Sequence, residues 1–69
     1  MRGEVLTGQL IYVDTEEAQI QIMDRATGEV TELDIVPDIK AHWDRLVGRD
    51  VEAVVIDGKT REVYSQVEE

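Results

Sequence analysis

The amino-acid sequence predicts a mainly β protein, in which residues 1–69 form one small five-stranded barrel with a single short helix between the third and fourth strands. Composition is the first observation: ten Val and six Ile stand against four Leu and four Ala, and β-branched side chains favour the pleated surface of a strand. The second is that apolar and polar residues alternate over short segments bounded by turn-forming residues. The third is length, because 69 residues allow one thin core and no second domain.

The first predicted strand covers residues 4–14. Its apolar residues do not alternate cleanly, and Gly8 lies in its middle. A long strand that bends at a glycine or a bulge explains this pattern, because its inward face can change sides at that point. Such a strand belongs to two sheets, as small closed barrels require. A polar turn over residues 14–17 follows it.

The second and third strands are predicted over residues 18–23 and 29–36. The loop between them, residues 24–29, has hairpin chemistry, with Gly28 able to adopt a positive φ. Pro37 ends the third strand because it has no amide hydrogen to donate. The residues expected to face inward are Ala18, Ile20, Ile22, Leu33 and Ile35, whereas Glu32 and Asp34 are expected to face water.

A helix is predicted to begin at Pro37, which suits the first helical position, with Asp38 beside it to complement the helix dipole. Gly48 is expected just past its last turn. Between them the apolar residues recur at helical spacing and form one stripe, which we expect to cover one end of the barrel and to place a tryptophan in the core. The stripe consists of Ile39, Trp43, Leu46 and Val47.

The fourth strand is predicted over residues 50–56 and the fifth over residues 59–67. Asp57 and Gly58 between them are the strongest turn signal in the chain and predict a tight type I′ hairpin. The inward residues of the fourth strand are expected to be Val51, Ala53 and Val55; on the fifth, Val63, Ser65 and Val67 are expected on one face and Tyr64 on the other.

This order of elements, with three strands, a helix and two further strands, resembles the OB-fold, a five-stranded Greek-key barrel with its helix between the third and fourth strands. The resemblance covers nearly the whole chain and is topological, since no family motif supports it. Src-homology-type barrels usually place a helical turn between the last two strands, where this chain has Asp57 and Gly58. An open five-stranded sheet packed on the helix is the alternative fold.

The sequence excludes several kinds of chemistry. Cysteine is absent and His42 is the single histidine, which excludes disulfides, thiolate sites and a multi-histidine metal site within one chain. No nucleophile elbow or phosphate-cradling glycine loop is present, and the grouped carboxylates match no calcium-loop spacing. We therefore predict no enzyme activity, no cofactor and no metal site, with His42 on a polar helix face and the carboxylates forming a solvated rim.

Seven Lys and Arg against 16 Asp and Glu give a net charge of −9. Proteins that grip phosphate backbones need an electropositive surface, so this charge argues against nucleic-acid binding. The longest apolar run, residues 10–13, is too short for a signal-peptide core or a membrane span, which leaves the cytoplasm as the expected compartment. The acidity fits either a basic partner or a salt-adapted host.

Residues 51–56 are apolar on both faces of their strand, so the outward side chains need a cover. Either the bending of the sheet and the helix cover them, or they form an exposed apolar patch with an acidic rim, which marks a contact with another protein. We predict a small binding or structural module whose partner is another protein or a second copy of the chain. The expected interface residues are Ile11, Met23, Val54, Ile56 and Tyr64.

The resemblance to the OB-fold implies a second candidate surface, on the second and third strands and the loops that flank them. It would bind a single-stranded nucleic acid or an oligosaccharide weakly. Glu32 and Asp34 on this surface repel phosphates, which makes this the alternative function. The candidate residues are Tyr12, Gln19, Gln21, Lys59 and Arg61.

Overall fold

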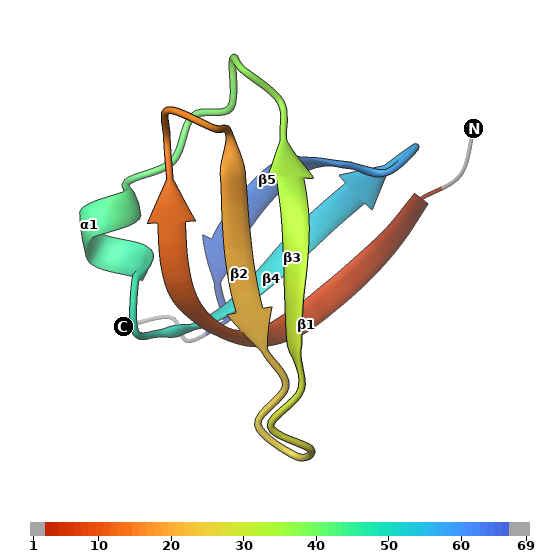
Figure 1. Cartoon of the computed structure of the whole chain (residues 1–69), viewed down its shortest axis with the longest axis vertical. Coiled ribbons are helices and arrows are strands. Elements are labelled where there is room, and N and C mark those ends of the chain that lie inside the picture. Colours follow the sequence, from red (N-terminus) through yellow and green to blue (C-terminus); the bar gives the residue numbers. More distant parts are fainter. Residues whose placement is uncertain (1–2, 67–69) are drawn as a thin grey trace.

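The computed structural model describes residues 3–66 and shows five strands closed into a barrel, with one short helix at its side (Figure 1). The strand order around the ring is β1-β2-β3-β5-β4, and β4 pairs with β1 to close it. This confirms the predicted fold class. The elements are β1 (Gly3–Asp14), β2 (Gln19–Met23), β3 (Val30–Ile35), α1 (Trp43–Leu46), β4 (Asp50–Ile56) and β5 (Lys59–Ser65).

Strand β1 bends across the barrel and pairs with two neighbours, as the sequence predicted (Figure 1). Its first half lies beside β4 and its second half beside β2, and Gln9 is in register with a residue of each. A Cβ at Gly8 would lie 2.5 Å from the carbonyl oxygen of Met23, so the close approach of β2 requires a glycine. A bulge at Ile11 follows, where the register shifts between Leu10 and Tyr12.

The core lies inside the ring and receives side chains from every strand and from α1. Alternation along β2 and β4 places every second residue inward, so the inward residues expected for those strands are confirmed. Strand β3 contributes Ile35, with Leu33 packed partly against the core. The buried cluster consists of Leu10, Ile20, Ile22, Ile35, Leu46, Val51, Ala53 and Val63.

The helix is much shorter than predicted, because α1 begins at Trp43 rather than at Pro37. After β3 the chain makes a turn in which the Ile39 N–H donates to the carbonyl of Val36 over 3.2 Å. It then passes over the end of the barrel toward α1 (Figure 1), and Ile39, Ala41 and Trp43 pack against the core while the residues between them are exposed. This spacing of two residues replaces the predicted helical stripe. Val47, the last residue of that stripe, is 46% exposed.

The connection between β4 and β5 is confirmed as a tight hairpin. Asp57 and Gly58 have φ values of 52° and 81°, and two successive positive φ angles are the signature of a type I′ turn. Strand β5 ends at Ser65, and the predicted end of this strand at Val67 lies outside the described residues. Val63 is buried and Tyr64 exposed, as expected.

The pairing of β3 with β5 is the shortest in the barrel. It is parallel and covers two residue pairs, Asp34 with Lys59 and Ile35 with Thr60. One further backbone hydrogen bond, from the Val36 N–H to the Thr60 carbonyl at 3.0 Å, extends it. Beyond Thr60, β5 no longer pairs with β3. Within residues 3–66, the rest of β5 pairs with β4.

Replacement of Gly8 by alanine tests the close contact between β1 and β2. We expect Gly8→Ala to lower the free energy of unfolding by about 2 kcal/mol, because the new methyl group collides with backbone atoms that cannot move aside cheaply. Gly3→Ala is the matched control, since its Cβ would lie 3.8 Å from the nearest atom. Urea denaturation of both variants gives the comparison; equal stabilities would contradict the geometry at Gly8.

Thr60 provides a second test, because its side chain is fully buried and its hydroxyl has no hydrogen-bond partner in the described structure. A buried hydroxyl without a partner costs free energy that a methyl group of the same shape does not. Thr60→Val should therefore raise the free energy of unfolding by about 1 kcal/mol. Thr31→Val, at an exposed position of β3, is the control and should change it little; a loss of stability in Thr60→Val would show that the hydroxyl is bonded.

Candidate functional site

The outward face of β1, β4 and β5 carries apolar side chains that the fold leaves uncovered. Val5 of β1 is in register with Val54 of β4, and Gly3 is in register with Ile56, so Ile56 has no side chain opposite it on β1. Val5 is 55% exposed and Tyr64 is 45% exposed, whereas Val54 and Ile56 are half-buried. We call this surface the outer strip; its residues are Val5, Val54, Ile56 and Tyr64.

Acidic residues border the outer strip. Glu52 lies opposite Tyr64 across β4 and β5, and the Tyr64 hydroxyl donates a hydrogen bond of 2.7 Å to its carboxylate. Glu62 lies opposite Val54. The hydrogen bond to Glu52, together with partial desolvation and the negative charges of Glu52 and Glu62, raises the pKa of the Tyr64 phenol above its ordinary value. Tyr64 therefore presents a neutral ring beside an acidic edge.

The five interface residues expected from the sequence do not lie together. Val54, Ile56 and Tyr64 share the outer strip, whereas Met23 is in register with Gln9 and Val30 on the part of the barrel built by β1, β2 and β3. Ile11 stands at the bulge where β1 pairs with β2. The bend of β1 thus separates the predicted patch into two groups.

Sequence reasoning missed Val5 as a member of the outer strip. The signal was present: Leu6 and Leu10 are four residues apart and so share one side of a strand, and Val5, which precedes Leu6, must face the opposite side. The bulge at Ile11 hid this pattern, because it shifts the alternation by one residue for the rest of the strand.

The alternative ligand surface is assembled in part. Tyr12, Gln21 and Glu32 form one cross-strand row over β1, β2 and β3. The next row contains Gln19, Asp34 and Lys59, and the Gln19 amide donates to Asp34 over 3.4 Å.

Carboxylates alternate with the amides across these two rows, which lowers the electrostatic attraction for phosphate groups. Arg61 lies beyond the two residues of β5 that pair with β3, so it does not belong to either row.

A cleft of about 740 Å³ lies between residues 40–49 and the last residues of β5. The cleft is lined by three basic residues, Lys40, Arg45 and Arg49, and by His42. Among the described residues that line it, Asp44 is the acidic one. Leu46 and Val63 supply apolar walls, and these side chains reach the surface from the core cluster. We call this feature the basic cleft.

The sequence did not predict the basic cleft, because the charges of residues 37–50 sum to zero along the chain. In the structure two of the three acids are not among the residues that line the cleft. Asp38 does not line the cleft, and the Asp50 carboxylate accepts a hydrogen bond from Arg25 in an ion pair. The spatial separation of acids from cations creates a positive region that a count along the sequence cannot find.

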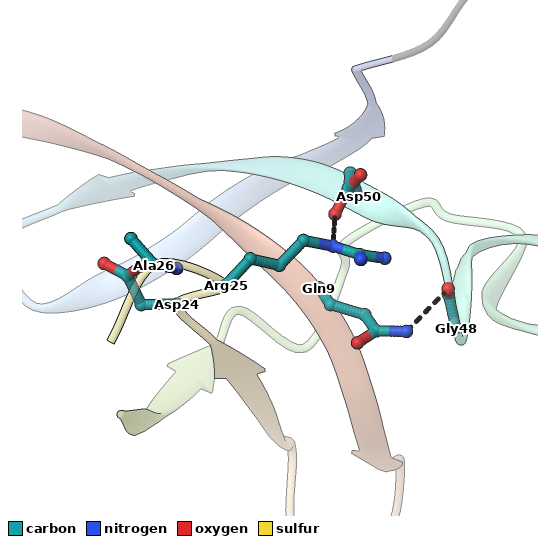
Figure 2. A network of polar contacts seen from close by, with 6 residues as sticks. All are labelled: Gln9, Asp24, Arg25, Ala26, Gly48 and Asp50. Carbon is teal, nitrogen blue, oxygen red and sulfur yellow. Dashed lines mark hydrogen bonds and ion pairs between the residues drawn. The ribbon is translucent and has the colours of Figure 1, made fainter. Parts of the chain in front are cut away.

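The Arg25–Asp50 pair belongs to a polar network at the start of β4 (Figure 2). The β2–β3 loop that carries Arg25 is held in shape by the Asp24 carboxylate, which accepts the Ala26 N–H at 2.8 Å. Gln9 donates its side-chain amide to the carbonyl of Gly48 at 2.9 Å. The network ties a hairpin loop and the bend of β1 to the segment that enters β4.

Residues 3–66 contain no group of three or more His, Asp or Glu side chains arranged to hold a metal ion. In the same part of the chain, no helix has the length and apolar character needed to cross a bilayer. Comparisons with protein-family models, with curated proteins and with solved structures found no match for this chain. Any functional conclusion therefore depends on the surfaces described above.

Substitution of Glu52 tests the Tyr64 hydrogen bond. We expect Glu52→Gln to lower the Tyr64 pKa toward its ordinary value, because the charged acceptor that favours the neutral phenol is removed. The pair stabilises the fold below the unfolded-state pKa of tyrosine, and this contribution is lost as the pH rises through the raised folded-state pKa. NMR titration of the Tyr64 ring carbons measures the pKa.

Glu4→Gln is the control for this titration, since it removes one negative charge from β1 at a residue in register with Val55 rather than with Tyr64. It should shift the Tyr64 pKa much less than Glu52→Gln does. An equal response to the two variants would indicate a general charge effect and would contradict the specific hydrogen bond.

Proposed function

We propose that this chain is a non-enzymatic binding module that docks another protein on the outer strip. The observation that carries the proposal is the pairing of Val5 with Val54 on the outside of a closed barrel, next to the uncovered Ile56. Apolar side chains gathered on an exposed face and bordered by polar residues mark protein contacts. Tyr64 adds an aromatic anchor of the kind that dominates binding energy at interfaces.

We also infer that the barrel is OB-like. Its support is the ring order, with the helix between β3 and β4, and the incomplete pairing of β3 with β5, since the OB-fold is a partly open Greek-key barrel. This inference concerns topology. It supplies a scaffold for binding surfaces and does not by itself name a ligand.

The expected partner carries basic groups around an apolar contact. Glu52 and Glu62 flank the outer strip, and the whole chain has a net charge of −9, so a basic rim on the partner gains electrostatic attraction during encounter. A second copy of the chain brings the same negative charge to the contact. We therefore commit to a different, basic protein as the occupant rather than to a homodimer.

The alternative function is weak binding of an oligosaccharide on the surface of Tyr12, Gln19 and Gln21. Its support is the cross-strand row of an exposed aromatic ring, an amide and a carboxylate, because sugars use stacking and neutral hydrogen bonds. The same carboxylates disfavour a single-stranded nucleic acid. Lys59 adds limited positive charge at one end.

Replacement of Val54 by aspartate tests the outer strip with a defined probe, a short synthetic peptide of leucine and lysine. Val54→Asp should weaken peptide binding at least about tenfold, because it places a charge in the apolar contact. Non-specific attraction between a basic peptide and an acidic protein would instead grow with the added negative charge. Amide NMR titration gives both the affinity and the residues that respond.

Gln21→Asp is the matched control, since it adds the same charge to the β2 surface and should leave the affinity unchanged or slightly higher. Val54→Thr keeps the β-branched shape and adds no charge. It therefore provides a second variant of the outer strip in case Val54→Asp does not fold. Equal binding by Val54→Asp, or dimerisation that this variant abolishes, would overturn the proposal. A response at Tyr12 and Gln21 to an oligosaccharide, with none at the outer strip to the peptide, would establish the alternative.

A further inference from the structure

We propose that the basic cleft binds a small organic acid, that is, a carboxylate carried on an apolar body. The cleft has a volume of about 740 Å³, which is in the size range of pockets that hold small molecules. It adjoins the outer strip, because Tyr64 borders both surfaces. Its ligand belongs to a different chemical class from the basic protein proposed for the outer strip, and the experiment below tests the two surfaces separately.

The segment of residues 40–49 supplies the positive charge of the cleft. Lys40, Arg45 and Arg49 line it and are exposed, and none of the three forms an ion pair within residues 3–66. Asp44 is the acidic side chain among the described lining residues. Three cations beside one carboxylate leave a surplus of positive charge, which a concave surface focuses even on a chain with a net charge of −9. An anion is therefore the favoured ligand.

Apolar side chains lie in the same cleft as these cations. Leu46 and Val63 belong to the core cluster and also line the cleft. Val47 lines it as well, and this side chain is 46% exposed. A ligand with an apolar body would remove part of this surface from water, which favours binding. The lining thus suits a molecule that is charged at one end and apolar at the other.

This combination favours an amphipathic carboxylate over a phosphate. A guanidinium group presents its donors in a planar fork that matches a carboxylate, and two arginines line the cleft. Inorganic phosphate would meet the same charges but would leave Val47 in water. A nucleic acid would bring further phosphates past the many acids of the remaining surface, where repulsion opposes it. A small acid places its single charge inside the cleft.

The test uses the intact chain and phenylpropionate, a small carboxylate with an apolar ring. Amide NMR titration should show saturable shifts at residues 40–49 and at Val63. Arg45→Gln and Arg49→Gln should each weaken binding about fivefold, because each removes a charge-assisted hydrogen bond. Arg61→Gln is the matched control, since Arg61 is exposed and is not among the residues that line the cleft. It should change the affinity less than about twofold.

The charge and the apolar body of the ligand are tested one at a time. Phenylpropionamide keeps the ring without the charge and should bind at least about tenfold more weakly than phenylpropionate. Val47→Ser should weaken phenylpropionate binding about threefold, because less apolar surface is covered. Equal binding of the amide would overturn recognition of the carboxylate. Tighter binding of inorganic phosphate would overturn the apolar body, and no response in the cleft would overturn the site.

Variants of each surface separate this test from that of the outer strip. Val54→Asp should keep its affinity for phenylpropionate within about twofold, because Val54 does not line the cleft; Val54→Thr is measured beside it in case the aspartate variant does not fold. Arg45→Gln should keep its affinity for the peptide of leucine and lysine. Loss of phenylpropionate binding in folded Val54→Asp would place the ligand on the outer strip and overturn the cleft site. Failure of the unaltered chain to bind the peptide counts against the outer strip alone.

Discussion

The structure depends on the bend of β1, because this strand closes the ring by pairing with β4 along its first half and with β2 along its second half. Gly8 permits this bend: β2 comes so close to its Cα that no side chain fits. The bulge at Ile11 then shifts the alternation so that Leu10 and the partly buried Val13 both pack inward. A glycine and one extra residue thus set which side of β1 faces the core and which faces solvent.

The candidate surfaces follow from that closure. The outer strip exists because the first half of β1 lies beside β4 and leaves Val5 next to Val54 on the outside. The basic cleft exists because the segment between β3 and β4 brings Lys40 and His42 to the same cleft as the last residues of β5. Tyr64 borders both surfaces. The charged side chains of the two surfaces differ in sign, which a single net charge for the chain does not reveal.

The sequence was sufficient for features that depend on local chemistry. Alternation along β2 and β4 predicted their inward residues, and Asp57 with Gly58 predicted the hairpin, because period and turn geometry are set by neighbouring residues. It was insufficient for residues 37–42, where helix-start chemistry at Pro37 competes with the packing of Ile39 and Ala41 on the core. Tertiary contacts decided that segment. The basic cleft could not be predicted either. Its positive charge depends on an ion pair between Asp50 and Arg25, which is distant in sequence.

The two-residue pairing of β3 with β5 is the weakest point in the hydrogen-bonded ring. The other four strand pairings are longer antiparallel ladders. Local opening of the ring therefore costs least at the β3–β5 pairing, and it leaves the other pairings intact. Thr60 lies in this pairing, and its buried hydroxyl has no hydrogen-bond partner among residues 3–66. Opening of the ring at this pairing would expose Thr60, which is fully buried in the closed barrel.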